Sequence, residues 1–137
     1  MSREPRWLTR RQVEAIHGQE VLRRGGFDGV RDDDAIESAL ARPRQKWTYE
    51  QAELPALAAA YGFGLAKNHG YVDGNERTAF TALVVFLGLN GYDLIRPEPE
   101  VVTVMEGVAS SELSEAELAA WIGESVTPRP PKKPASE

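Results

Sequence analysis

The chain of 137 residues is long enough for one hydrophobic core and too short for two ordinary domains. Its 42% hydrophobic and 27% charged residues are typical of a soluble globular protein, and the lack of cysteine excludes disulfides and thiol catalysis. No run is apolar enough to cross a bilayer, and the first residues lack the apolar stretch of a secretory signal. We therefore expect a cytoplasmic protein with no membrane partner.

The net charge of −5 is unevenly distributed along the chain. Residues 25–127 carry seven basic and seventeen acidic side chains, a net charge of −10, and only the two ends are basic. A protein that grips a polyanion through its body needs the opposite sign. Direct binding of nucleic acid is therefore not expected.

The first third of the chain predicts two helices. Apolar residues recur at helical spacing from Thr9 to Arg24, with Thr9 as the N-cap, and Gly25-Gly26 ends this helix. A second, short helix is expected from Asp32 to about Arg42, because carboxylates at a helix start cap free N–H groups. Pro43 should end it, leaving residues 44–51 as a loop or a small hairpin.

The rest of the chain also favours helices, predicted over 54–67, 78–89, 97–109 and 114–123. Residues 78–89 are apolar on nearly every side, so we expect this segment to be the most buried helix. The fold class predicted is all-α, a compact bundle with at most a small hairpin, over residues 7–125. The segment 126–137, rich in proline and lysine, is expected to be a disordered tail.

A candidate phosphate-binding loop precedes the apolar helix. If a helix begins near Asn75, Gly74 allows the chain to turn there, and the first N–H groups of the helix point outward. Such groups bind phosphate oxygens, and Arg77 in the first turn can add a forked guanidinium contact. A cation at this end of a helix is unfavourable unless an anion is bound.

Two further side chains of this loop carry chemistry. Asp73 offers a hard oxygen ligand for Mg²⁺ that bridges phosphates, and the imidazole of His69 could act as a general base. Taken singly, each has a simpler explanation as a turn or capping residue. The buried helix that follows favours the functional interpretation, because it would hold the loop rigidly, as a catalytic site requires.

This segment resembles the signature of the Fic/Doc family, His-Pro-Phe-x-Asp/Glu-Gly-Asn-Gly-Arg-x-x-Arg in Fic proteins and His-x-Phe-x-Asp-x-Asn-Lys-Arg-Thr-Ala in the Doc (death-on-curing) branch. The shared positions are His69, Asp73, Gly74, Asn75, Arg77, Thr78 and Ala79. Phe80 stands where Fic proteins have a second arginine, which favours the Doc branch. The resemblance extends over residues 7–122.

The resemblance implies the toxin of a type II toxin–antitoxin pair, neutralised by an antitoxin peptide. Proteins of the Doc branch transfer the γ-phosphate of ATP to elongation factor Tu and so arrest translation. The resemblance implies that His69 would deprotonate the target hydroxyl and that Asp73 would hold Mg²⁺. Gly74 and Asn75 would form the anion-binding nest, and Arg77 would bind phosphate. Residues 44–51 stand where the family has a flap that clamps the target.

The sequence departs from the family pattern at three positions. Gly70 replaces the proline of Fic proteins, and Tyr71 replaces a phenylalanine, a mild change if its hydroxyl finds a partner. Glu76 stands where Doc proteins have lysine. At ~4 Å and an effective dielectric constant near 20, its repulsion of a phosphate is about 4 kcal/mol, unless the carboxylate turns to solvent.

Three functions remain open from the sequence. The first is an ATP-dependent protein kinase, the second an enzyme that transfers AMP, and the third a binding module whose nucleotide site is impaired by Glu76. The absence of a second arginine at Phe80 disfavours AMP transfer. His17, on the first helix, is interpreted as structural or solvated.

Overall fold

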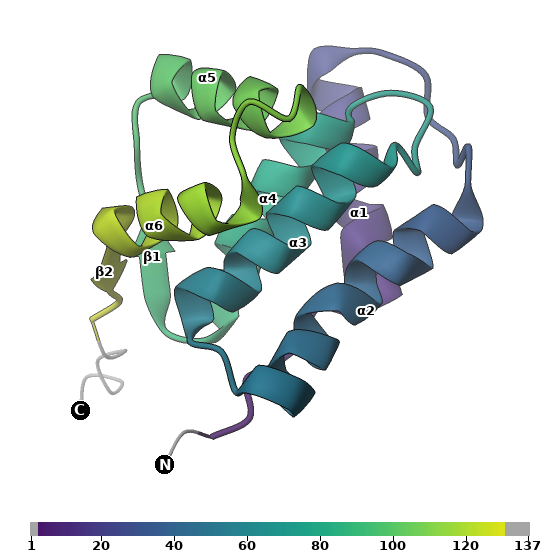
Figure 1. Cartoon of the computed structure of the whole chain (residues 1–137). Helices are drawn as coiled ribbons and strands as arrows, with labels where there is room; N and C mark the ends of the chain where they lie inside the picture. Colours follow the sequence, from purple (N-terminus) through teal and green to yellow (C-terminus); the bar gives the residue numbers. More distant parts are fainter. Residues whose placement is uncertain (1–2, 131–137) are drawn as a thin grey trace, which may run out of the picture.

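The computed structural model describes residues 3–130, and in these residues the chain forms six helices and two short strands. Figure 1 shows the elements in chain order: α1 (Arg10–Arg24), α2 (Asp33–Glu50), α3 (Leu54–Asn68), α4 (Asn75–Leu89), β1 (Tyr92–Leu94), α5 (Glu98–Ala109), α6 (Glu115–Ser125) and β2 (Val126–Pro128). The predicted all-α fold is confirmed. No helix in the described range is long and apolar enough to span a membrane.

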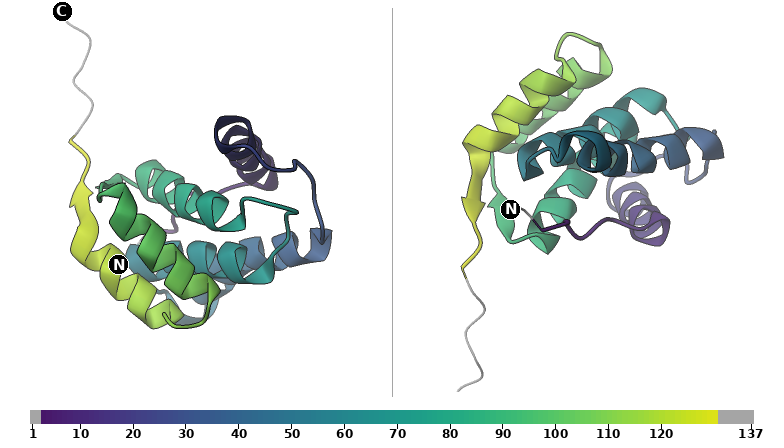
Figure 2. Two further views of the ribbon diagram at one scale, coloured as in Figure 1. Left: turned by 90° about the horizontal axis from the view of Figure 1, so that it is seen from above. Right: turned by 60° about the horizontal axis from the view of Figure 1, so that its bottom comes forward.

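Helix α3 is the centre of the bundle. It contacts α2, α4 and α6, and Figure 2 shows α1 and α6 on opposite sides of the α3–α4 pair. Nine of its fifteen residues are buried, against six of fifteen in α4, so the prediction that 78–89 is the most buried helix is wrong. Glycine allows the close packing, because a Cβ at Gly64 would lie 3.1 Å from the backbone of Ala39 in α2.

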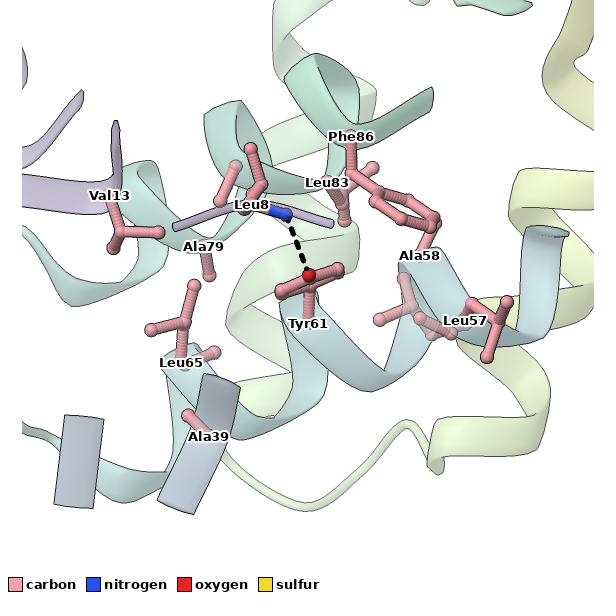
Figure 3. Close-up of a cluster of buried hydrophobic side chains, with 14 of the residues drawn as sticks. Leu8, Val13, Ala39, Leu57, Ala58, Tyr61, Leu65, Ala79, Leu83 and Phe86 are labelled. Atoms are coloured by element: carbon pink, nitrogen blue, oxygen red, sulfur yellow. Dashed lines mark hydrogen bonds between the residues drawn. The ribbon is translucent and has the colours of Figure 1, made fainter. Parts of the chain in front are cut away.

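The segment before α1 is held in the core by a buried hydrogen bond between Leu8 and Tyr61. The backbone N–H of Leu8 donates to the hydroxyl of Tyr61 at 3.0 Å, and both residues are almost completely buried. Figure 3 shows this bond among the side chains of α3 and α4, where the ring of Tyr61 also packs on Phe86 with centroids 4.9 Å apart. The buried hydroxyl is therefore satisfied, and α1 starts from a fixed point.

Helix α2 does not end at Pro43, so two predictions are wrong. The helix runs from its N-cap Asp32 to Glu50, and residues 44–50 are helical rather than a loop or a hairpin flap. Proline inside a helix removes one backbone hydrogen bond. Pro43 is buried, and Trp47 in the following turn packs against the core, so tertiary contacts outweigh the local cost.

The two strands close the end of the bundle away from the α3–α4 loop. β1 pairs antiparallel with β2, with Tyr92 opposite Pro128 and Leu94 opposite Val126. The expectation of a disordered tail from residue 126 is therefore wrong for residues 126–128. Residues 129 and 130 are also described, and Arg129 donates its backbone N–H to the carbonyl of Gly91 at 2.8 Å. The rest of the predicted tail, 131–137, lies outside the described residues.

Candidate active-site loop

The loop between α3 and α4 is fastened to the segment between α1 and α2, and Figure 1 shows the two segments side by side. The carbonyl of Gly70 accepts the backbone N–H groups of Arg31 and Asp32 at 2.8 and 3.0 Å, and Val72 donates to the carbonyl of Gly29 at 3.0 Å. These bonds join residues about 40 positions apart in the sequence. The loop therefore has a defined conformation although it contains no helix or strand.

Asn75 closes the loop onto the start of α4. Its side-chain oxygen accepts the backbone N–H of Tyr71 at 3.0 Å, and its side-chain nitrogen donates to the carbonyl of Tyr71 at 2.9 Å. The side chain of Asn75 is thus engaged within the loop, and the anion-binding role predicted for this residue depends on its backbone N–H.

The N-terminus of α4 has the geometry of an anion-binding site. Gly74 is its N-cap, in the left-handed conformation with φ of 78°, and it provides no side-chain cap. The first N–H with an intrahelical acceptor is that of Thr78, which donates to the carbonyl of Gly74 at 2.9 Å. The three preceding N–H groups of the helix lack such an acceptor, and they carry the positive end of the helix dipole. The anion-binding nest at Gly74 and Asn75 stays a prediction, and this helix terminus is where it would form.

His69 and Asp73 lie at the two ends of the loop. His69 ends α3 in the left-handed conformation with φ of 50°, and its side chain is exposed. Asp73 is half-buried, and its Oδ2 accepts the backbone N–H of Phe27 at 2.9 Å. This bond orients the carboxylate and leaves Oδ1 for another ligand.

The loop fits a magnesium ion of the kind that arrives with a nucleotide. In the described residues, no group of three or more His, Asp or Glu side chains could hold a metal ion. Mg²⁺ in phosphate-transfer sites is commonly held by one or two carboxylates together with substrate phosphates and water. A single oriented carboxylate at Asp73, beside an anion-binding helix terminus, is consistent with that mode.

Glu76 and Arg77 face a pocket of about 360 Å³ between α1, α4 and α5. Glu76 is half-buried and Arg77 is exposed, and Arg23 and Arg24 at the end of α1 line the same pocket. Glu76 therefore does not extend freely into solvent, and it shares this pocket with side chains of both charges: four arginines, including Arg96, and three further glutamates, Glu20, Glu98 and Glu106. A larger hollow, of about 910 Å³, lies at the opposite end of the α3–α4 pair and includes no residue of the motif.

Tyr71, which replaces the phenylalanine of the signature, has a partner for its hydroxyl. The buried phenol donates a hydrogen bond to Glu14 of α1. Burial, and next the bond to Glu14, raise the pKa of Tyr71 well above its usual range. Glu14 is itself paired with Arg10 at 3.2 Å, so the departure from phenylalanine is accommodated.

His17 of α1 contacts the motif loop, which the sequence did not predict. It is 2% exposed, its ring stacks on Tyr71, and its Nε2 lies 2.8 Å from the carbonyl oxygen of Asp73. The interpretation as structural remains open, but the residue is not solvated. The sequence held one signal, because His17 lies one helical turn after the apolar Val13 and so falls on the buried face of α1.

Comparison with known proteins identifies the class that this fold and loop define. The model of the Fic/DOC family matches residues 7–87, which include the whole motif, so the chain belongs to the Fic/Doc family. Within it the chain falls in the Doc branch. It is 29% identical over 115 residues to the protein kinase doc of Escherichia phage P1, covering 83% of this chain and 90% of that protein. It is 41% identical over 90 residues to the toxin Doc of Mycolicibacterium smegmatis, covering 60% of this chain and 68% of that protein.

Proposed function

We propose that this protein is a Doc-like toxin that transfers the γ-phosphate of ATP to a hydroxyl group of a protein target. The observation that carries the proposal is the uncapped N-terminus of α4, which lies directly after an oriented carboxylate at Asp73. Phosphoryl transfer requires mainly positioning and charge stabilisation, and this loop offers both. The names of the two relatives, a protein kinase and a toxin, support the same function.

Each residue of the loop has a role in this proposal. His69 is exposed, so it can reach a hydroxyl on a large partner and accept its proton. The hydroxyl oxygen then bonds to the γ-phosphorus as the bond from that phosphorus to the bridging oxygen breaks, and ADP leaves. The N–H groups at Gly74 and Asn75, with the guanidinium of Arg77, hold the phosphates. When bound at Asp73, Mg²⁺ supplies charge neutralisation for the phosphates.

Transfer of AMP is a weaker candidate because of Phe80. In the Fic signature an arginine at this position binds phosphate, whereas the ring of Phe80 packs against Trp121 with centroids 6.4 Å apart. An apolar side chain directed at α6 provides no charge for a nucleotide. The third candidate, a binding module with an impaired nucleotide site, depends on Glu76.

The pocket between α1, α4 and α5 is the proposed site of the antitoxin peptide. Phe80, Val101 and Met105 line it and provide an apolar floor, and Val102 on α5 is 46% exposed. Apolar anchors of this kind accept a peptide helix in helix-in-groove recognition. The rim carries both arginine and glutamate, which suits a partner with mixed charges. This proposal requires a small antitoxin reading frame beside the one that encodes this chain.

The decisive experiment uses elongation factor Tu, the target that the family resemblance suggests. The full chain, ATP and Mg²⁺ are incubated with elongation factor Tu, and the intact mass of the factor is measured. Addition of one phosphate supports the proposal, addition of one AMP supports the alternative chemistry, and an unchanged mass with active protein overturns the target assignment. His69→Ala is the matched control. Growth arrest on expression in a bacterial host would in addition support a cytoplasmic toxin.

A further inference from the structure

The buried face of α1 carries a histidine that contacts the motif loop at the peptide between Asp73 and Gly74. His17 stacks face to face on Tyr71, with ring centroids 3.8 Å apart and planes 11° apart. Its Nε2 is 2.8 Å from the carbonyl oxygen of Asp73. A carbonyl oxygen only accepts hydrogen bonds, so Nε2 carries the proton and donates it.

This bond determines the direction of a neighbouring N–H group. The carbonyl of Asp73 and the N–H of Gly74 belong to one planar, trans peptide unit, in which the two groups point in opposite directions. Because His17 holds the carbonyl toward α1, the N–H of Gly74 is directed away from α1. The ring lies next to Gly74 as well, since a Cβ at that position would be 3.8 Å from it.

The carboxylate of the same residue is held by a second contact from the same part of the chain. Phe27, in the segment that follows α1, donates its backbone N–H to Oδ2 of Asp73. Gly26 allows this approach, because a Cβ there would lie 3.3 Å from the Cβ of Asp73. Asp73 is therefore fixed at its backbone by His17 and at its side chain by Phe27.

We infer that His17 is a positioning residue of the active site, acting through the Asp73–Gly74 peptide. It orients the Asp73 carboxylate toward the metal that accompanies the nucleotide and the Gly74 N–H toward the phosphate. This role rests on the transferase function proposed above. His17 touches neither substrate nor metal, and its effect passes entirely through the loop.

Two substitutions separate the hydrogen bond from the packing of the ring. His17→Phe keeps an aromatic ring on Tyr71 and loses the donor, whereas His17→Gln keeps an N–H near the place of Nε2 and loses the stack. The control is Val13→Ala, which removes a fully buried side chain one turn earlier on α1 and has no hydrogen bond to the loop. It measures the effect of simply loosening the helix.

The first readout does not require activity. Amide hydrogen exchange of the Phe27 N–H, measured by NMR on the full chain, should accelerate about 5- to 10-fold in His17→Phe, the effect of one lost hydrogen bond. It should change little in His17→Gln and in Val13→Ala. Equal exchange in wild type and His17→Phe would overturn the inference.

The second readout uses phosphate transfer. His17→Phe should raise the Mg²⁺ concentration needed for half-maximal rate and lower kcat, and His17→Gln should restore most of both. If His17→Phe does not fold, NMR of the imidazole nitrogens in the wild type shows which of them carries the proton. The inferred hydrogen bond requires a proton on Nε2, and an unprotonated Nε2 overturns the inference. If the wild type transfers no phosphate to any protein, the proposed function fails while the exchange experiment still tests His17.

Discussion

The side chain of Asn75 and the backbone of Tyr71 form a closed ring of two hydrogen bonds, at 3.0 and 2.9 Å. These two bonds span the turn that contains Asp73 and Gly74, so a side chain from the first residue of α4 fixes the conformation of the turn. Because Asn75 is half-buried, water has little access to the backbone N–H and carbonyl of Tyr71, which would lose their partners if the amide were removed.

Replacement of Asn75 by alanine should therefore destabilise the fold by about 2 kcal/mol, the contribution of two intramolecular hydrogen bonds. Transfer activity should fall as well, since the turn that carries Asp73 loosens. Urea denaturation measures the first effect. Asn68→Ala is the control, because its amide makes a single exposed bond to the carbonyl of Ala35 and should cost about half as much. Equal losses in the two variants would contradict the role of the Asn75 ring.

Gly70 should be the least replaceable glycine of the loop. A Cβ at this position would lie 2.3 Å from Cγ1 of the buried Ile36, so Gly70→Ala should destabilise by about 1–3 kcal/mol through overpacking. Ile36→Ala in the same chain should recover part of that loss. Gly18→Ala, inside α1 and with open space around it, should instead stabilise by about 1 kcal/mol. Thermal or urea unfolding of the four proteins checks these signs.

His69 should be dispensable for folding and essential for transfer. Its side chain is exposed, so His69→Ala should change stability by less than about 0.5 kcal/mol. Loss of a general base should reduce the transfer rate roughly 10²- to 10⁴-fold and abolish growth arrest. Rate measurements together with circular dichroism test both statements, and full toxicity in a folded His69→Ala protein would show that the arrest has another cause.

Glu76→Lys should tighten the binding of ATP with Mg²⁺. The change removes a negative charge beside the phosphate nest and adds a positive one, so we expect roughly tenfold higher affinity at low salt and a smaller gain at high salt. Arg23 and Arg24 line the same pocket, but Arg24 is paired with Glu20 at 3.8 Å and with Glu98 at 3.2 Å, and within the described residues no ion pair joins either arginine to Glu76. Calorimetry on wild type and Glu76→Lys measures the affinity for ATP with Mg²⁺. The control is Glu112→Lys, because Glu112 is an exposed residue in the turn before α6. Equal affinities in wild type and Glu76→Lys would remove the electrostatic reason to doubt an active enzyme.

The sequence was sufficient for the motif and for most helices because their signals are local. The N-cap at Thr9, the glycine at the start of α4 and the apolar spacing of α3 act within one or two turns. The boundary predicted at Pro43 was wrong because tertiary packing, not a local signal, decides where α2 ends. Proline is unfavourable inside an isolated helix, and only the packing of α2 on α3 makes the longer helix favourable.

The groups available to the site can be read from eleven consecutive residues, 69–79, which contain a histidine, a carboxylate and the free N–H groups at a helix start. How these groups are held depends on contacts between distant parts of the chain. His17 lies 56 residues before Asp73 and Phe27 lies 46 residues before it, so no local pattern could pair them. The same holds for Glu76, whose half-buried position in the pocket between α1, α4 and α5 depends on the packing of these helices. Burial of α1 against α4 brings these distant residues together, because the apolar face of α1 must leave water and the loop is then placed beside it.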